Sequence, residues 1–181
     1  MERNVVMIAL FAALIAVLGL IPAITLGFGV PITAQSLGVM MCGTVLGARR
    51  GALAVLLFLL LVALGLPLLA GGRGGLGVFA SPTVGFLVGF PVSAFVAGLI
   101  VEKTRSLPLV VTATAGAAIG GIFFMYICGI VGMAVTLDKT LAEATLLATP
   151  FLPGDAIKAV IAGMLTSALA RARPASVLSR S

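Results

Sequence analysis

Six long apolar stretches run along the chain, separated by short groups of charged residues, prolines and glycines. By hydropathy, the stretches cover roughly residues 4–21, 33–48, 51–69, 83–101, 107–133 and 152–170. A helix that crosses a bilayer needs about 20 mostly apolar residues. The pattern therefore predicts an all-α integral membrane protein, a bundle of six transmembrane helices that forms a single domain over residues 1–181.

The segments between and before these stretches carry further structural signals. The second and third stretches meet at Arg49 and Arg50, which predicts a tight helical hairpin whose turn lies at the membrane face. Charged residues alternate with leucines over 136–149, as in an amphipathic interfacial segment, although an ordinary solvated loop would look similar. The first stretch is too long for the apolar region of a signal peptide and lacks a cleavage site, so we expect a retained helix.

Composition excludes several classes of protein. The chain is 61% hydrophobic and only 9% charged, whereas soluble domains carry about 25% charged residues. Without a histidine there is no His-based triad or imidazole metal ligand. Cys42 and Cys128 are isolated in apolar stretches and form no metal or redox motif. The pI of about 10.4 does not indicate nucleic-acid binding, because the basic residues are not clustered on a soluble surface.

The basic residues predict the orientation instead, since cytoplasmic loops are enriched in Lys and Arg. With the N-terminus in the cytoplasm, eight of the 11 basic residues fall on that side. These eight are Arg3, Arg49, Arg50, Lys103, Arg105, Arg171, Arg173 and Arg180. Arg73, Lys139 and Lys158 fall on the opposite side. We therefore expect both termini in the cytoplasm.

One acidic and one basic residue stand close together where the last stretch begins. Asp155 and Lys158 are three positions apart, so on a helix they share one face. Ionisable residues near lipid are functional by default, which favours a polar binding site. The alternative is that Asp155 caps the helix N-terminus while Lys158 reaches the headgroups.

Two glycine- and proline-rich connections are candidates for the rest of a site. The first, 20–35, contains Phe28 and ends in Gln35, which needs a hydrogen-bond partner if it is buried. In the second, Ala70-Gly71-Gly72-Arg73-Gly74-Gly75, glycines surround one arginine and allow unusual backbone dihedrals. This run is no phosphate-binding P-loop, because no lysine follows a glycine. A flexible re-entrant turn remains the alternative to a binding loop.

Three blocks together, 26–35, 65–86 and Phe151 to Lys158, resemble the BioY family in order and spacing over nearly the whole chain. The resemblance implies the S-component (RibU-like) fold and a biotin-binding S component of an energy-coupling-factor transporter in the bacterial cell (inner) membrane. Such a subunit is not an enzyme and needs no cofactor. It takes up biotin with a transmembrane coupling subunit and a pair of cytoplasmic ATPases, and its partners include the lipid bilayer but no nucleic acid.

The resemblance also assigns residues. It associates Asp155 and Lys158 with the biotin head group, and it places Arg73 where its charge could pair with the valerate carboxylate. Leu87 stands where some members have a basic residue for that carboxylate, so the sequence departs from the family there. The remaining predicted biotin-binding residues are Gln35, Phe28, Gly72, Gly74, Thr83 and Phe86.

The first stretch contains an expected docking surface for a partner. Small residues four apart allow close helix approach. The family docks its coupling subunit on such a stripe, which here corresponds to Ala9 and Ala13.

Other functions remain as alternatives. An enzyme is disfavoured because the five acidic residues are scattered along the chain. A structural or assembly subunit of another membrane complex, or a binder of a different small vitamin, remains the alternative.

Overall fold

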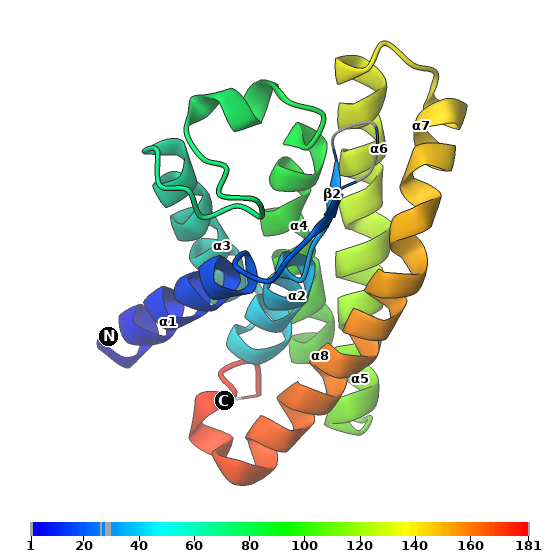
Figure 1. The fold of residues 1–181 in the computed structure, drawn as a ribbon. Coiled ribbons are helices and arrows are strands. Elements are labelled where there is room, and N and C mark those ends of the chain that lie inside the picture. The colour runs from blue at the N-terminus through cyan, green and yellow to red at the C-terminus, as the bar shows by residue number, and fades with distance from the viewer. Residues whose placement is uncertain (1, 26, 28–29, 181) are drawn as a thin grey trace.

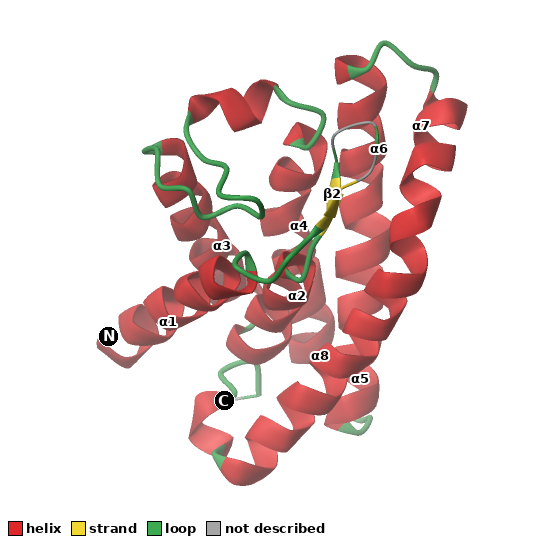
Figure 2. Cartoon of the chain, viewed as in Figure 1, coloured by secondary structure: helices red, strands yellow, loops and turns green. Residues whose placement is uncertain are grey.

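The computed structural model is an all-helical bundle with one short hairpin of two strands, and it describes residues 2–25, 27 and 30–180 (Figures 1 and 2). In chain order its elements are α1 (Glu2–Leu18), β1 (Ile24–Thr25), β2 (Pro31–Ile32), α2 (Gln35–Leu46), α3 (Ala48–Ala63), η1 (Leu76–Ala80), α4 (Val84–Lys103), α5 (Leu109–Ala118), η2 (Ile119–Phe124), α6 (Met125–Thr136), α7 (Leu141–Ala148), η3 (Thr149–Phe151), α8 (Leu152–Ala172) and η4 (Pro174–Ser176).

These elements form the six helices that the hydropathy pattern predicts, because two of the helices are composite. α5, the π-helical turn η2 and α6 run without a break as a 28-residue helix, Leu109–Thr136. α7, the 3-10 turn η3 and α8 form a 32-residue helix, Leu141–Ala172. The amphipathic segment at 136–149 is thus mostly helix α7, which Thr140 and Glu143 start with a reciprocal capping box.

In the part of the chain that the structure describes, three helices are long and apolar enough to cross a membrane, namely α4 and the two composite helices. α2 has only 12 residues, which is about 18 Å of helix against a hydrocarbon core of about 30 Å. Figure 1 shows that α2 lies inside the bundle, and most of its side chains are buried there. The predicted span at 33–48 is therefore a short internal helix.

The boundaries of the third predicted span differ from the structure at both ends. The hairpin turn lies at Gly47, where φ is +87°, and Arg49 and Arg50 already belong to the first turn of α3. The Gly47 backbone favours glycine because a Cβ is strained at positive φ. At the other end α3 stops at Ala63, and Gly65 also has a positive φ. The chain over 64–69 is consequently a loop rather than the end of a span.

α4 is the central helix of the bundle, and it packs against α2, α3, α5 and α6. Glycines allow the closest approaches. A Cβ on Gly43 would meet the backbone of Ala94, and a Cβ on Gly132 of α6 would meet the backbone of Gly85 of α4. Small residues of this kind replace bulky side chains at helix contacts in membranes, and they let α4 lie against its neighbours.

We predict that Gly132→Ala destabilises the protein by about 1–3 kcal/mol, the usual cost of overpacking a close contact. The added methyl would collide with the Gly85 backbone. Thermal unfolding of the purified protein in detergent measures the change. Gly154→Ala is the matched control, because a Cβ there meets nothing within 4 Å. Equal unfolding midpoints in both variants would show that the α4–α6 contact tolerates a side chain.

Candidate functional site

A cavity lies between the β1–β2 hairpin, the first turn of α2, the loop that carries Arg73, the first turns of α4, and helices α6 and α8. It is lined by Val30, Pro31, Ile32, Thr33, Gln35, Ser36, Leu69, Arg73, Thr83, Phe86, Leu87, Phe90, Met125, Phe151, Asp155 and Lys158. Segments from five separate parts of the sequence therefore meet around one space.

Asp155 and Lys158 form an ion pair inside this cavity wall, with Nζ of Lys158 at 2.9 Å from Oδ1 of Asp155. Their side chains are only 9% and 16% exposed. Asp155 makes no helix-capping hydrogen bond, because α7 and η3 continue directly into α8 and leave no free helix end there. In the structure, Asp155 and Lys158 thus pair with each other in the cavity wall. Asp155 does not cap a helix, and Lys158 does not extend toward the headgroups.

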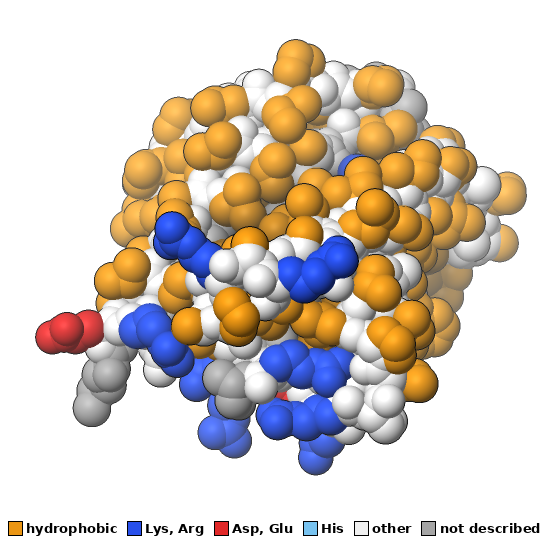
Figure 3. Space-filling view, turned by 90° about the horizontal axis from the view of Figure 1, so that it is seen from below, with side chains coloured by type: hydrophobic (Ala, Val, Ile, Leu, Met, Phe, Trp, Pro, Cys, Tyr) orange, Lys and Arg blue, Asp and Glu red, His pale blue; other side chains and the backbone are white. Residues whose placement is uncertain are grey.

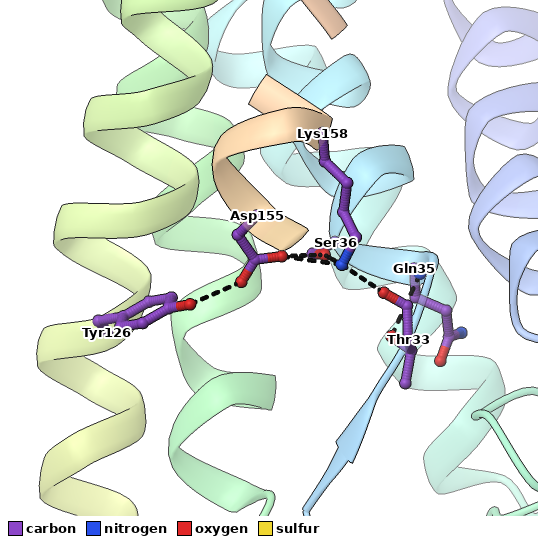
Figure 4. Close-up of polar contacts among 6 residues, drawn as sticks. All are labelled: Thr33, Gln35, Ser36, Tyr126, Asp155 and Lys158. Atoms are coloured by element: carbon purple, nitrogen blue, oxygen red, sulfur yellow. Dashed lines mark hydrogen bonds and ion pairs between the residues drawn. The ribbon is translucent and has the colours of Figure 1, made fainter. Parts of the chain in front are cut away.

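Two further side chains complete the surroundings of Asp155, as Figure 4 shows. Ser36 donates its hydroxyl to Oδ1 at 2.9 Å, and Tyr126 donates to Oδ2 at 2.8 Å. An ionised carboxylate accepts about four hydrogen bonds. Because Oδ1 accepts two and Oδ2 accepts one, Asp155 keeps acceptor capacity on Oδ2.

Lys158, in contrast, has no free donor. Its ammonium group donates to the carbonyl oxygen of Thr33 at 2.6 Å, to Oγ of Ser36 at 3.0 Å and to Asp155. Three donors is the full capacity of an ammonium group. A ligand oxygen can accept a hydrogen bond from Lys158 only if one of these three bonds breaks, for example the bond to the carbonyl of Thr33.

Ser36 and Tyr126 are not among the residues predicted from the sequence. Ser36 directly follows Gln35 in the first block, and Tyr126 is the only tyrosine of the chain, standing in an apolar stretch. The sequence did offer a signal for Tyr126, since a buried Tyr hydroxyl needs a hydrogen-bond partner. It does not show that this partner is Asp155, 29 positions away.

Gln35 is buried, at 2% exposure, and its amide holds three parts of the backbone together. Nε2 donates to the carbonyls of Ile15 and Leu68, and Oε1 accepts from the N–H of Ala70 at 3.0 Å. The expectation that a buried Gln35 needs a partner is confirmed. Its side chain fixes the loop over 68–70 against the end of α1, so the structure gives it a positioning role at the cavity wall.

Arg73 reaches the cavity from a tight turn that Gly71 and Gly72 form with φ of +78° and +70°. Nε of Arg73 donates to the carbonyl of Ala70 at 3.3 Å, the one hydrogen bond of its guanidinium to the described residues. Partial burial lowers the pKa of Arg73 because desolvation disfavours the charged form. An arginine nevertheless stays protonated, so the turn presents a cation with free donors.

The predicted glycines beside Arg73, Gly72 and Gly74, do not line this cavity. Gly72 lines a second, outer cleft of about 490 Å³ formed by 19–23, Pro31 and 70–73. Gly74 lines neither space, and a Cβ there would collide with the carbonyl of Leu66. Arg73 and Pro31 line both spaces and form the wall between them. The outer cleft is the larger, but Arg73 is its only charged side chain.

Aromatic side chains form another part of the cavity lining, here called the aromatic wall. Phe86 contacts Phe151 with ring centroids 5.8 Å apart and Tyr126 edge-on at 6.1 Å. Thr83 is buried, and its hydroxyl lies 2.7 Å from that of Ser81. Of the predicted residues, six line the cavity: Gln35, Arg73, Thr83, Phe86, Asp155 and Lys158. Phe28 lies outside the described residues.

The cavity is narrow in this conformation. Its volume is about 60 Å³, whereas a single water molecule needs roughly 10–15 Å³. It combines an apolar, aromatic side with one carboxylate that can still accept and one guanidinium that can still donate. This arrangement suits a small, partly apolar ligand that carries N–H donors at one end and an anion at the other.

Comparison with known proteins identifies close relatives over nearly the full length. The chain is 54% identical to the biotin transporter BioY of Rhodobacter capsulatus over 99% of its own residues and 100% of that protein. It is 34% identical to the biotin transporter BioY of Thermotoga maritima, covering 90% and 93% of the two chains.

The fold matches a solved structure as well. A crystal structure of the S-component for biotin from an ECF-type ABC transporter superposes with a TM-score of 0.89 at 29% identity, covering 94% of this chain and 92% of that one. The profile of the BioY family matches residues 2–175. This chain belongs to the BioY family.

Proposed function

We propose that this protein is the substrate-binding membrane subunit of an energy-coupling-factor transporter, which captures biotin with high affinity from outside for uptake into the cytoplasm. The observation that carries the proposal is the buried Asp155, which keeps a free acceptor position beside an aromatic wall. Full-length similarity to biotin transporters of the same family supports it. ATP hydrolysis then takes place on separate subunits.

Biotin complements the cavity at both ends. Its ureido ring has two N–H donors and one carbonyl acceptor, so an N–H can donate to Oδ2 of Asp155, which accepts from Tyr126 alone. The bicycle lies against the aromatic wall of Phe86 and Phe151. The valerate carboxylate pairs with the free guanidinium donors of Arg73. Arg73 thereby takes the place of the basic residue that the sequence lacks at Leu87.

Binding requires the cavity to widen, because biotin is larger than a few water molecules. Pro31 of the β1–β2 hairpin and Arg73 on its turn form the wall between this cavity and the outer cleft. Lys158 links the β2–α2 connection to the ion pair through the carbonyl of Thr33. A ligand that takes over this Lys158 donor would release the hairpin side of the wall at the same time.

A stripe on α1 is the proposed docking surface for the coupling subunit. Ala9 and Ala13 are exposed, whereas Ala12 is buried and Ala16 half-buried against the bundle. Large apolar side chains, Val6, Leu10 and Val17, are exposed on the same outer part of the helix. Helix α1 therefore offers an outward apolar surface with two small residues, Ala9 and Ala13, at which a partner helix can approach closely.

The distribution of charge supports a cytoplasmic position for both termini. The end of the bundle that carries the chain termini is here called the base. It holds the eight basic residues predicted to face the cytoplasm, and Figure 3 views it from below. Only two acidic residues, Glu2 and Glu102, belong to that end, whereas acidic and basic residues are equal in number at the other. This asymmetry follows the positive-inside rule.

Replacement of either member of the ion pair should weaken biotin binding strongly. A hydrogen bond to a charged group contributes about 1.5–3 kcal/mol, so we expect Asp155→Asn and Lys158→Met each to raise the Kd by roughly 10- to 150-fold. Binding of radiolabelled biotin to the purified protein measures this. Asp138→Asn and Lys139→Met remove the same charges from the exposed α6–α7 connection and should leave the Kd unchanged. Unaltered affinity in Asp155→Asn would contradict the proposed function.

Arg73→Gln should weaken binding of biotin more than binding of a neutral biotin amide. The variant removes the charge that pairs with the carboxylate and keeps a polar side chain of similar reach. We expect the ratio of the two Kd values to change about tenfold, which corresponds to roughly 1.4 kcal/mol for the lost charge pair. If biotin and its amide lose affinity equally, Arg73 does not contact the carboxylate.

Bulky residues on the α1 stripe should block transport and spare binding. In Ala9→Trp with Ala13→Trp we expect ATP-driven uptake of biotin to be lost, since the indoles keep the partner helix away, while binding in detergent stays unchanged. Ala115→Trp, at an exposed alanine of α5, is the control that should retain uptake. Loss of biotin binding in the double variant would instead assign the stripe to packing within the bundle.

A further inference from the structure

Cations that have no ion-pair partner among the described residues lie around the C-terminal tail at the base of the bundle. Among the described residues, the one ion pair within 4 Å is that of Asp155 and Lys158 in the cavity. The basic residues of the base therefore have no carboxylate at pairing distance in the described chain. Figure 3 shows several of their side chains grouped on this face, next to apolar surface.

The tail itself is fixed firmly and brings one of these cations into place. Val177 and Leu178 are buried, and Ser179 donates its N–H to the carbonyl of Val45 at 3.0 Å and its hydroxyl to that of Thr44 at 2.6 Å. This places Arg180 against the α4–α5 connection. There its guanidinium donates to Oγ1 of Thr112 at 2.6 Å and to the carbonyl of Thr104 at 3.1 Å.

Arg105 lies beside Arg180, and Arg50 contacts the same tail two residues earlier. Arg105 accepts a hydrogen bond from Arg180 on its carbonyl and donates its own Nε to the carbonyl of Glu102. Arg50 donates to the carbonyl of Leu178 in the tail at 3.4 Å. Burial and the neighbouring charge of Arg105 both lower the pKa of Arg180. Within residues 30–180, the acceptors of the three guanidinium groups are carbonyl and hydroxyl oxygens, which bind the donors without contributing a negative charge.

The carboxylate of Glu102, whose carbonyl accepts from Arg105, is already engaged. Oε1 of Glu102 accepts from the backbone N–H of Ala48 at 3.0 Å, at the start of α3. Apolar side chains follow Arg105 along the chain, since Leu107 before α5 and Val110 and Val111 in its first turn are exposed. Positive charge thus lies next to an apolar helix face. A phospholipid has the matching arrangement, with a phosphate next to its acyl chains.

We propose that Arg50 and Arg105 bind the phosphate of an anionic phospholipid from the leaflet around the base, with its acyl chains against the start of α5. Arg180 uses most of its donors within the protein and adds positive charge to this group. Guanidinium groups bind phosphate through paired N–H donors, and each basic residue near an anionic leaflet contributes attraction. The site is independent of biotin, since the tail and the cavity share no residue.

Native mass spectrometry of the purified protein with phosphatidylglycerol or phosphatidylcholine tests the proposal. We expect one phosphatidylglycerol to bind more tightly than phosphatidylcholine, and Arg105→Gln and Arg50→Gln each to weaken it about fivefold. Arg171→Gln and Arg173→Gln remove the same charge from the exposed end of α8 and should leave this binding unchanged. Unaltered biotin affinity in all four variants shows that they are folded.

Three results would overturn the proposal. Equal binding of the two lipids would exclude recognition of the headgroup charge. An equal loss in the α8 control variants would mean that the total charge of the base, and not this group, attracts the lipid. Stabilisation by inorganic phosphate in detergent to the same degree as by phosphatidylglycerol would assign the site to a free anion.

Discussion

The structure of the binding region depends on the buried ion pair between Asp155 and Lys158. Removing two charges from water is costly, and their attraction offsets the cost only when the remaining donors and acceptors are satisfied. Here Ser36, Tyr126 and the carbonyl of Thr33 provide those partners from α2, α6 and the segment after β2. Because the partners come from elements far apart in the sequence, the pair also determines how α2, α6 and α8 lie around the cavity.

The two cations of the region differ in what they can still do. Lys158 uses all its donors within the protein, whereas Arg73 uses Nε alone among the described residues. Lys158 therefore maintains the geometry of the site and Arg73 remains available to an incoming anion. Gln35 resembles Lys158 in this respect, since its amide is occupied by three backbone groups and contributes mainly to the position of the turn that carries Arg73.

Local patterns were sufficient to predict much of this from the sequence. Hydropathy predicts the six helices, and helical periodicity places Asp155 and Lys158 on one face, as the structure has them. The short α2 and the turn at Gly47 were missed because apolar composition does not distinguish a buried helix from a spanning one. The roles of Ser36 and Tyr126 depend on contacts over 119 and 29 positions, which no local pattern contains.

The π-helical turn η2 has a consequence for the direction of Tyr126. A π turn contains one residue more than an α turn, and each residue of a helix advances by about 100° around the axis. Met125 and Tyr126 follow η2 immediately, so the extra residue determines the direction in which both side chains point around the helix axis. An uninterrupted α-helix from Leu109 would keep the same sequence and apolar surface, yet it would aim the phenol about a quarter-turn away from the carboxylate.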